Sequence, residues 1–282
     1  LIGATIAKAL TRYDIGAMKI TLAACLTLCV LSTATAPLRA ASSDWYHVEG
    51  GAIRLVESAA PAEDGGRRAA LEIKLNPGWK TYWKDPGSSG VPPIVSTMQG
   101  GVATTAKLHF PTPKWFDDEY GDWAGYDDTV TIAVSLERSS EPVGTPTKAN
   151  VFLGICETIC IPVHVDIVVD KGLNQAVAAD EQIVAAAFDA LPAPAAPALH
   201  LRIADIADRD LLAEAIVPEH TRVTDLFVAG TDTVTFGAPT RHAERDIPTY
   251  TINVRGATKP GDVFDYTLVT SDGAVHGQLQ IP

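Results

Sequence analysis

Two cysteines, Cys156 and Cys160, are the residues whose type and spacing are best suited to chemistry, and they lie in the stretch Gly-Ile-Cys-Glu-Thr-Ile-Cys-Ile-Pro. On a straight strand their Cα atoms would lie about 13 Å apart, whereas a disulfide needs them within about 7 Å. If the two cysteines pair, residues 157–159 must therefore fold back as a turn. Pro162 follows closely and cannot donate to a strand ladder, which is typical of a strand end or an edge strand.

A disulfide between these cysteines has two interpretations. Closing a ring of about five residues stabilises a fold by only about 2 kcal/mol, which a domain of this size hardly needs. Two neighbouring cysteines do suit thiol–disulfide exchange, in which one thiolate attacks a partner's disulfide and the second cysteine resolves the mixed disulfide. An inert, structural disulfide remains the alternative.

A metal site is a third interpretation, because Cys156, Cys160 and His164 recur at a spacing of four residues. Soft thiolates together with imidazole suit Cu(I) or Zn(II). However, only two sulfurs are available, and a histidine in such a segment is more often an ordinary strand residue. We expect no cofactor, with Cu(I) as the alternative.

The N-terminal segment predicts export. Met18-Lys19 precedes an apolar run at residues 20–31, and small residues follow, which together describe a secretory signal peptide cleaved near Ala40. The run is too short for a membrane-spanning helix of about 20 residues. The residues before Met18 are interpreted as an upstream segment, so residues 1–40 are set apart from the fold.

Removal of the signal peptide would leave Cys156 and Cys160 as the only cysteines. A Leu-Ala-Ala-Cys box ends at Cys25 and resembles a lipoprotein cleavage site, but the apolar run continues past it. Export places the cysteine pair in an oxidising compartment where disulfides form, and we expect a periplasmic location.

Composition limits the remaining functions. The formal net charge of −12 disfavours nucleic acid and anionic lipid as partners, because like charges repel. Hydrophobic residues make up 46% of the chain, which allows a sizeable core and argues against global disorder. A length of 282 residues accommodates two ordinary domains.

The pattern along the chain predicts an all-β protein. Alternating segments at 69–75, 129–136 and 163–169 indicate short strands separated by Gly- and Pro-rich turns. We therefore predict an immunoglobulin-like β-sandwich over residues 44–175. Strand-like segments return over residues 198–282, which predict a second, smaller β-sandwich without cysteine or tryptophan.

One helix is predicted between these two domains, at residues 177–191, within a connecting segment at 176–197. Its apolar face holds Ile183, Val184, Ala187 and Phe188. Three prolines among alanines follow, which predict a semi-rigid extended linker. The expected fold is two immunoglobulin-like β-sandwich domains joined by a short helix and a Pro/Ala linker.

Three segments together resemble a known family. Residues 152–164 resemble the cysteine segment in the N-terminal periplasmic domain of the DsbD-type thiol:disulfide interchange proteins, closest to the branch called suppressor of copper sensitivity protein B. Residues 76–93 resemble the other hallmark segment of that branch, and residues 115–121 are similar to the acidic and aromatic cap loop that covers the cysteines. The resemblance covers residues 45–170 well and residues 198–282 loosely.

The resemblance implies roles for particular residues. The second cysteine of the pair attacks the partner's disulfide in that family, so Cys160 would be the nucleophile and Cys156 the resolving residue. Tyr120 would belong to the cap, and Asp118 and Glu119 would assist proton transfer. A solvated surface turn is the alternative for these three. The three-residue spacing of the cysteines departs from the five residues of the best-known members.

Partners are also implied by the resemblance. Family domains of this kind receive electrons from a membrane-embedded domain and pass them to periplasmic thioredoxin-like proteins. Because the sequence ends at Pro282 without a membrane domain, we expect a separate inner-membrane electron donor. Trp79, Tyr82 and Trp83 are candidates for a docking surface beside the cysteines, with the sandwich core as the alternative; alternation would place Tyr82 on the opposite strand face from the two tryptophans.

Overall fold

The computed structural model describes residues 41–87, 90–118, 121–142, 144–170, 178–207 and 209–282. The predicted upstream segment and signal peptide at residues 1–40 lie outside this range. The described part consists of strands and one helix, which confirms the prediction of an all-β fold. Within the described ranges, no helix combines the length and the apolar character needed to span a bilayer.

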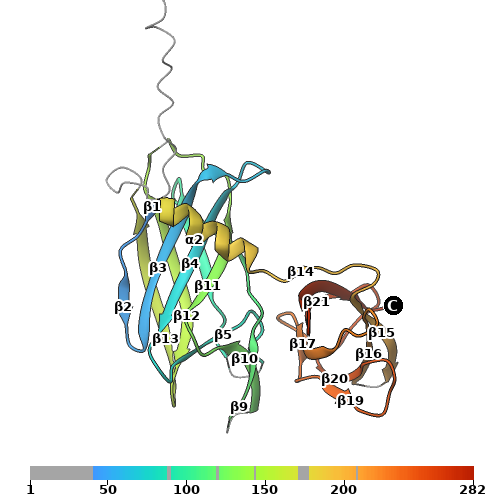
Figure 1. Cartoon of the computed structure of the whole chain (residues 1–282). Helices are drawn as coiled ribbons and strands as arrows, with labels where there is room; N and C mark the ends of the chain where they lie inside the picture. Colours follow the sequence, from blue (N-terminus) through green and yellow to red (C-terminus); the bar gives the residue numbers. More distant parts are fainter. Residues whose placement is uncertain (1–40, 88–89, 119–120, 143, 171–177, 208) are drawn as a thin grey trace, which may run out of the picture. The chain divides into compact units, whose positions relative to one another are not determined.

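Residues 41–169 build two antiparallel sheets, called here the N-terminal sheet pair (Figure 1). The first sheet has the order β1-β3-β4-β11-β8, with β2 on β3, and its strands are β1 (Ala41–Ser42), β2 (Tyr46–Val48), β3 (Gly51–Pro61), β4 (Arg67–Leu75), β8 (Lys107–His109) and β11 (Val130–Leu136). The second sheet contains β5 (Lys80–Tyr82), β6 (Ile94–Gln99), β7 (Val102–Thr105), β9 (Lys114–Asp118), β10 (Gly121–Tyr126), β12 (Thr147–Cys156) and β13 (Cys160–Val169).

Strand β12 organises the second sheet. One of its edges pairs with β13 along its whole length, from Thr147↔Val169 to Cys156↔Cys160. Its other edge pairs first with β6 and then, at its end, with β5. Every second residue faces the core, so Val151, Leu153 and Ile155 are each 0% exposed. The last residue of this central strand is a cysteine, so the strand holds that residue in a fixed position.

Helix α2 (Ala178–Asp189) covers the outer face of the first sheet. Its Val184 and Ala187 are buried against Val56, Ala70 and Ala133, which project from β3, β4 and β11. The predicted helix is thus confirmed, with slightly shorter bounds and with residue 177 outside the described residues. The apolar face that the sequence suggested is the face that contacts the sheet.

Residues 193–280 build the C-terminal sheet pair. One sheet has the order β14-β22-β21-β17, and the other has β15-β16-β20-β18 with β19 on β20. Their strands are β14 (Ala193–Pro194), β15 (His200–Ala207), β16 (Asp210–Ile216), β17 (Val223–Ala229), β18 (Thr235–Phe236), β19 (Thr240–His242), β20 (Thr249–Arg255), β21 (Val263–Thr270) and β22 (Gly273–Gln280).

The Pro/Ala segment after the helix differs from the extended linker that we predicted. Ala193 and Pro194 form β14, which pairs in parallel with β22, and the Ala195 amide donates to the His276 carbonyl at 2.7 Å. A proline is tolerated here because β14 is an edge strand, where the missing N–H leaves no ladder bond unmade. Proline content therefore predicted extension correctly but not pairing.

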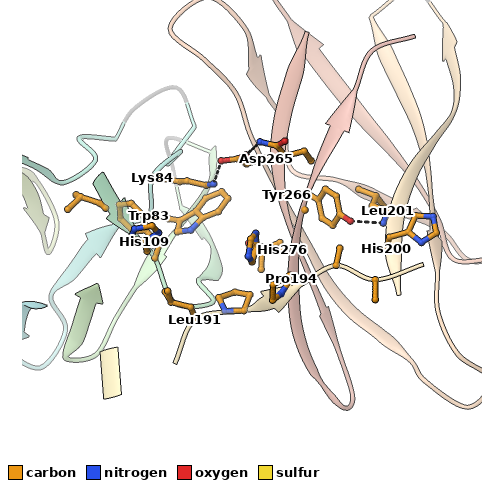
Figure 2. Close-up of a pocket in the computed structure, with 18 of the residues that line it drawn as sticks. Trp83, Lys84, His109, Leu191, Pro194, His200, Leu201, Asp265, Tyr266 and His276 are labelled. Atoms are coloured by element: carbon orange, nitrogen blue, oxygen red, sulfur yellow. Dashed lines mark hydrogen bonds and ion pairs between the residues drawn. The ribbon is translucent and has the colours of Figure 1, made fainter. Parts of the chain in front are cut away.

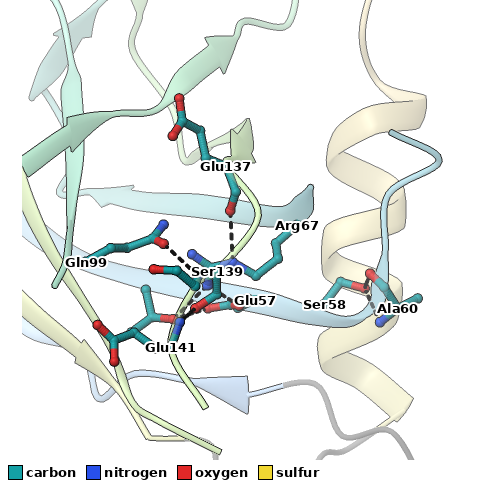
Figure 3. A network of polar contacts seen from close by, with 10 residues as sticks. Glu57, Ser58, Ala60, Arg67, Gln99, Glu137, Ser139 and Glu141 are labelled. Atoms are coloured by element: carbon teal, nitrogen blue, oxygen red, sulfur yellow. Dashed lines mark hydrogen bonds and ion pairs between the residues drawn. The ribbon is translucent and has the colours of Figure 1, made fainter. Parts of the chain in front are cut away.

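A buried ion pair closes the end of the N-terminal sheet pair that is remote from the cysteines (Figure 3). The Glu57 carboxylate, whose residue is 3% exposed, lies 2.6 Å from Arg67 Nη1 and accepts a 2.6 Å hydrogen bond from Thr147 Oγ1. Thr147 begins β12 and Cys156 ends it, about 30 Å further along an extended strand. The network therefore fixes the start of the strand without touching the cysteines.

The two sheet pairs contact one another through charged and aromatic side chains. Lys84 Nζ lies 2.8 Å from Asp265 Oδ2 (Figure 2). Beside this ion pair is a cavity of about 890 Å³, whose lining includes Trp83, His109 and His276. Burial lowers the pKa of His109, and the neighbouring Lys107 lowers it further. Neither cysteine lines this cavity, so the cysteine pair has to be considered as a separate site.

Candidate functional site

The cysteine pair lies at the closed end of the β12–β13 hairpin. Cys156 is the last residue of β12 and Cys160 the first of β13, and the two are directly opposite in the strand register. Their Cα atoms are 4.1 Å apart and their sulfurs form a disulfide. The Glu157 amide donates to the Ile159 carbonyl at 3.3 Å across the connecting residues. The predicted turn at residues 157–159 is confirmed.

The two cysteines differ in accessibility. Cys156 is 6% exposed, whereas Cys160 is exposed to solvent. Ile159, immediately before Cys160, is 70% exposed. A sulfur atom from another protein would therefore reach Cys160 far more easily than Cys156.

Tyr82 is the polar contact of both sulfurs. Its hydroxyl oxygen lies 2.6 Å from Cys160 Sγ and 3.1 Å from Cys156 Sγ. Disulfide sulfurs carry no hydrogen, so the hydroxyl is the donor in either contact. Gly154 leaves room for the tyrosine, because a Cβ at that position would lie 3.0 Å from a ring carbon of Tyr82. The glycine in the cysteine segment thus allows the hydroxyl to reach the disulfide.

An aromatic group adjoins Tyr82 and the buried cysteine. The Tyr82 and Trp123 rings meet edge to face with centroids 5.1 Å apart, and Trp123 stacks on Phe116 at 4.4 Å. Phe116 and Trp123 are opposite each other in the β9–β10 hairpin. The Lys80 ammonium lies 5.2 Å from the Phe116 ring centroid and 5.4 Å from that of Trp123. The pair is thus flanked by aromatic rings and one cation.

The predicted cap residues are only partly within the described structure. Asp118 ends β9, and its backbone pairs with Gly121 of β10. Glu119 and Tyr120 lie outside the described residues. The hairpin that carries this segment packs beside the disulfide through Phe116 and Trp123, but the roles of Asp118, Glu119 and Tyr120 stay predictions.

The three candidate docking residues divide between two surroundings. Tyr82 contacts the sulfurs, whereas Trp83, which is 2% exposed, and the half-buried Trp79 pack against the sandwich core. The predicted separation of strand faces is therefore confirmed. A side chain as buried as that of Trp83 offers no surface to a partner. Trp83 therefore belongs to the sandwich core, which was the alternative to a docking role. Docking at Trp79 or Tyr82 stays a prediction.

His164 does not approach the two sulfurs. It lies on β13 with Cys160, and four residues along a strand separate the two Cα atoms by about 13 Å. Its side chain contacts Asn150 and meets Phe152 edge to face instead. Among the described residues, no three or more His, Cys, Asp or Glu side chains gather into a possible metal site. The described structure, in which the two cysteines form a disulfide, therefore does not bring Cys156, Cys160 and His164 together, and the metal alternative stays a prediction.

Sequence reasoning missed Lys80, Phe116 and Trp123 as neighbours of the disulfide. A signal was available for two of them: a Trp-Phe pair and a Gly-Asp-Trp segment flank an acidic turn, which is the pattern of a hairpin. Pairing the two strands would have placed Phe116 opposite Trp123. The position of Lys80 could be predicted only by knowing that β5 pairs with the end of β12, and no local sequence pattern indicates that pairing.

Replacing Tyr82 by phenylalanine is expected to lower the reduction potential of the cysteine pair by about 20–30 mV. The hydroxyl bonds more strongly to a thiolate than to a neutral disulfide, because hydrogen bonds to ions are about twice as strong. Its loss therefore destabilises the reduced form more, by about 1 kcal/mol. Equilibration with glutathione buffers measures the potential.

The control for this substitution is Tyr46→Phe, because the Tyr46 hydroxyl accepts from the backbone amide of Val168 at 3.4 Å, far along β13 from Cys160. It should leave the potential at the wild-type value. A potential in Tyr82→Phe that is equal to or above the wild-type value would show that the hydroxyl does not favour the reduced form.

Comparison with known proteins places this geometry in context. Residues 54–171 match the model of the family described as "Thiol:disulfide interchange protein DsbD, N-terminal". The fold is similar to the crystal structure of the N-terminal periplasmic domain of ScsB from Proteus mirabilis, with a TM-score of 0.72 and 20% sequence identity over 85% of this chain and 98% of that chain. A comparison with curated protein sequences gave no match. The two matches confirm the resemblance that the three sequence motifs suggested.

Proposed function

We propose that this protein is a periplasmic thiol–disulfide interchange module that exchanges electrons with partner proteins through Cys156 and Cys160. The observation that carries the proposal is the asymmetric disulfide. One sulfur belongs to the exposed Cys160, the other to the buried Cys156, and the Tyr82 hydroxyl contacts both. Exchange needs one accessible sulfur for attack and a second, neighbouring thiol for resolution.

A purely structural role explains this arrangement less well. β12 and β13 are already joined by a ladder that runs from Thr147↔Val169 to the cysteines, so the hairpin does not depend on a cross-link at its end. In the chain-entropy model such a short ring contributes only about 2 kcal/mol. Structural disulfides are also commonly buried, whereas Cys160 is exposed.

The reaction follows from the two positions. In the reduced protein the Cys160 thiolate attacks one sulfur of a partner's disulfide, an S–S bond forms between the proteins, and the other partner sulfur leaves as a thiolate. The Cys156 thiolate then attacks Cys160 Sγ, which restores the intramolecular disulfide and releases the second partner thiolate. Two electrons pass to the partner, and its two thiolates take their protons from the solvent.

The partners and the location are part of the same proposal. The matching family is described by its thiol:disulfide interchange, and the similar ScsB domain is described as periplasmic. We infer thioredoxin-like proteins as electron acceptors and a membrane-embedded domain as the electron donor. We further infer that the two sheet pairs are immunoglobulin-like sandwiches.

The reduction potential of the Cys156–Cys160 pair tests the proposal. An exchanging pair should have a potential above about −300 mV and should pass its electrons to an oxidised thioredoxin-like protein, whereas a structural disulfide lies below that value. The potential follows from equilibration with dithiothreitol buffers, and mass spectrometry of the alkylated partner reports the transfer. A disulfide that stays oxidised in the native fold under strong dithiol reductant would leave only the structural interpretation.

A further inference from the structure

Lys80 is the cationic neighbour of the disulfide on the opposite strand. It begins β5 and is directly opposite Cys156 in the register between β12 and β5. The Cβ atoms of directly opposite residues lie about 4.5–5.5 Å apart, with their side chains on the same face. Lys80 and Tyr82 also share this face, because they are two residues apart on one strand. The lysine side chain therefore starts beside the buried cysteine.

The lysine ammonium is restrained on this face. Its Nζ lies over the Phe116 and Trp123 rings, at 5.2 and 5.4 Å from their centroids. Trp123 in turn meets the ring of Tyr82, whose hydroxyl contacts both sulfurs. Cation–π contact with two rings restrains the ammonium on this face without neutralising its charge.

Cys156 is the cysteine that needs such a charge. It is 6% exposed, and burial disfavours a thiolate. The Glu157 carboxylate next to it in sequence disfavours a second negative charge as well. The groups that favour the thiolate are the Tyr82 hydroxyl, at 3.1 Å from Cys156 Sγ, and the Lys80 ammonium. Asp127 is a further carboxylate near Lys80, whose positive charge helps to lower the Asp127 pKa. Asp127 is itself paired with Lys114.

We propose that Lys80 is a positioning residue for resolution: its ammonium keeps Cys156 deprotonated in the mixed disulfide, so that Cys156 can attack Cys160 Sγ. In that step the Cys156–Cys160 bond forms, the bond from Cys160 to the partner sulfur breaks, and the partner leaves as a thiolate. The inference rests on the proposed function, because it assigns Cys160 to attack and Cys156 to resolution. In this assignment Cys160 performs the attack on the partner, whereas Cys156 performs the resolution with the help of Lys80.

A small-molecule disulfide separates the two steps without a protein partner. When the reduced protein meets 5,5′-dithiobis(2-nitrobenzoate), attack by Cys160 releases one coloured thiolate, and resolution by Cys156 releases the second. In Lys80→Met the second release at pH 7 should be slowed about tenfold, as expected when the pKa of the attacking thiol rises by about one unit. The first release should change less than the second.

Three comparisons distinguish electrostatics from structure. The second release in Lys80→Met should approach the wild-type rate as the pH is raised above the thiol pKa, and Lys80→Arg should restore most of the rate at pH 7. Lys148→Met is the matched control, because Lys148 lies on the same face of β12 as Cys156 but about 26 Å from it along the strand. It should leave both releases unchanged.

Two results would overturn the inference about Lys80. One is a second release in Lys80→Met that matches wild type at every pH. The other is a slowing that is equal at every pH and is not restored by arginine, which would indicate a change of structure. If the wild-type protein shows both releases with this reagent but transfers no electrons to thioredoxin-like proteins, the proposed function fails while the role of Lys80 remains testable.

Discussion

Replacing Cys156 by serine is expected to convert exchange into capture. The reduced Cys156→Ser protein should form a mixed disulfide with an oxidised thioredoxin-like protein through Cys160, and this complex should persist until a thiol is added. The Cys160→Ser protein should react at least about a hundredfold more slowly. Non-reducing electrophoresis and intact mass spectrometry measure both outcomes.

The difference between the two variants follows from burial. Cys160 stays exposed when Cys156 is replaced, so attack on a partner proceeds, but no neighbouring thiolate remains to resolve the product. In Cys160→Ser the remaining sulfur belongs to a residue that is 6% exposed. It can meet a partner only after local opening, and an opening that costs about 3 kcal/mol slows the reaction about a hundredfold.

Both variants should fold, because the ladder between β12 and β13 does not depend on the sulfurs. Urea unfolding of the two serine variants serves as the control and should show similar free energies of unfolding. Equal capture by the two variants would contradict the assignment of Cys160 to attack and Cys156 to resolution. Capture by neither, with both folded, would contradict exchange with this class of partner.

The chemistry of the site was more predictable from sequence than its surroundings. The distance requirement of a disulfide predicted the turn between Cys156 and Cys160 without any knowledge of the fold. Alternation predicted that Tyr82 and Trp83 face opposite sides. These inferences depend only on local covalent geometry and on the period of a strand, which the sequence carries directly.

Long-range pairing was not predictable in the same way. Lys80 neighbours Cys156 because β5 pairs with the end of β12, and residues 80 and 156 are far apart in sequence. Phe116 and Trp123 reach Tyr82 only once β10 pairs with β5. Register between distant strands is set by which faces are buried and by how the strands stack, so a single segment does not reveal it. The parallel pairing of β14 with β22 was missed for the same reason.

The C-terminal sheet pair contacts the β9–β10 hairpin beside the cysteine site through Phe227 and Leu226. Phe227 of β17 is 0% exposed and stacks on Trp115 of β9, with ring centroids 5.0 Å apart. Trp115 Nε1 also donates to the Leu226 carbonyl at 3.2 Å. The next residue of β9, Phe116, faces the other way and stacks on Trp123 beside the disulfide. The β9–β10 hairpin is thus held by the second sheet pair on one face and adjoins the cysteines on the other.

Replacing Phe227 by alanine is expected to lower the free energy of unfolding by about 3–5 kcal/mol, the usual cost of removing a buried phenylalanine. The loss should also loosen the hairpin, because Phe227 contacts both Trp115 and Trp83 of the N-terminal sheet pair. Urea unfolding measures the first effect. Amide hydrogen exchange in β9 and β10 measures the second and should become faster.

Phe264→Ala is the matched control, because Phe264 is 2% exposed and its cluster is formed by residues of the C-terminal sheet pair and the segments adjoining it. Its ring meets Phe236 at a centroid distance of 4.8 Å and has no such contact with β9. This variant should be destabilised by a similar amount while β9 and β10 exchange at rates close to wild type under native conditions. If the hairpin amides exchange equally fast in both variants, the second sheet pair does not hold the hairpin through Phe227. If they are faster only in Phe227→Ala, then the C-terminal sheet pair helps to position the strands that flank the cysteine pair, which is a role for it that requires no reactive residue of its own.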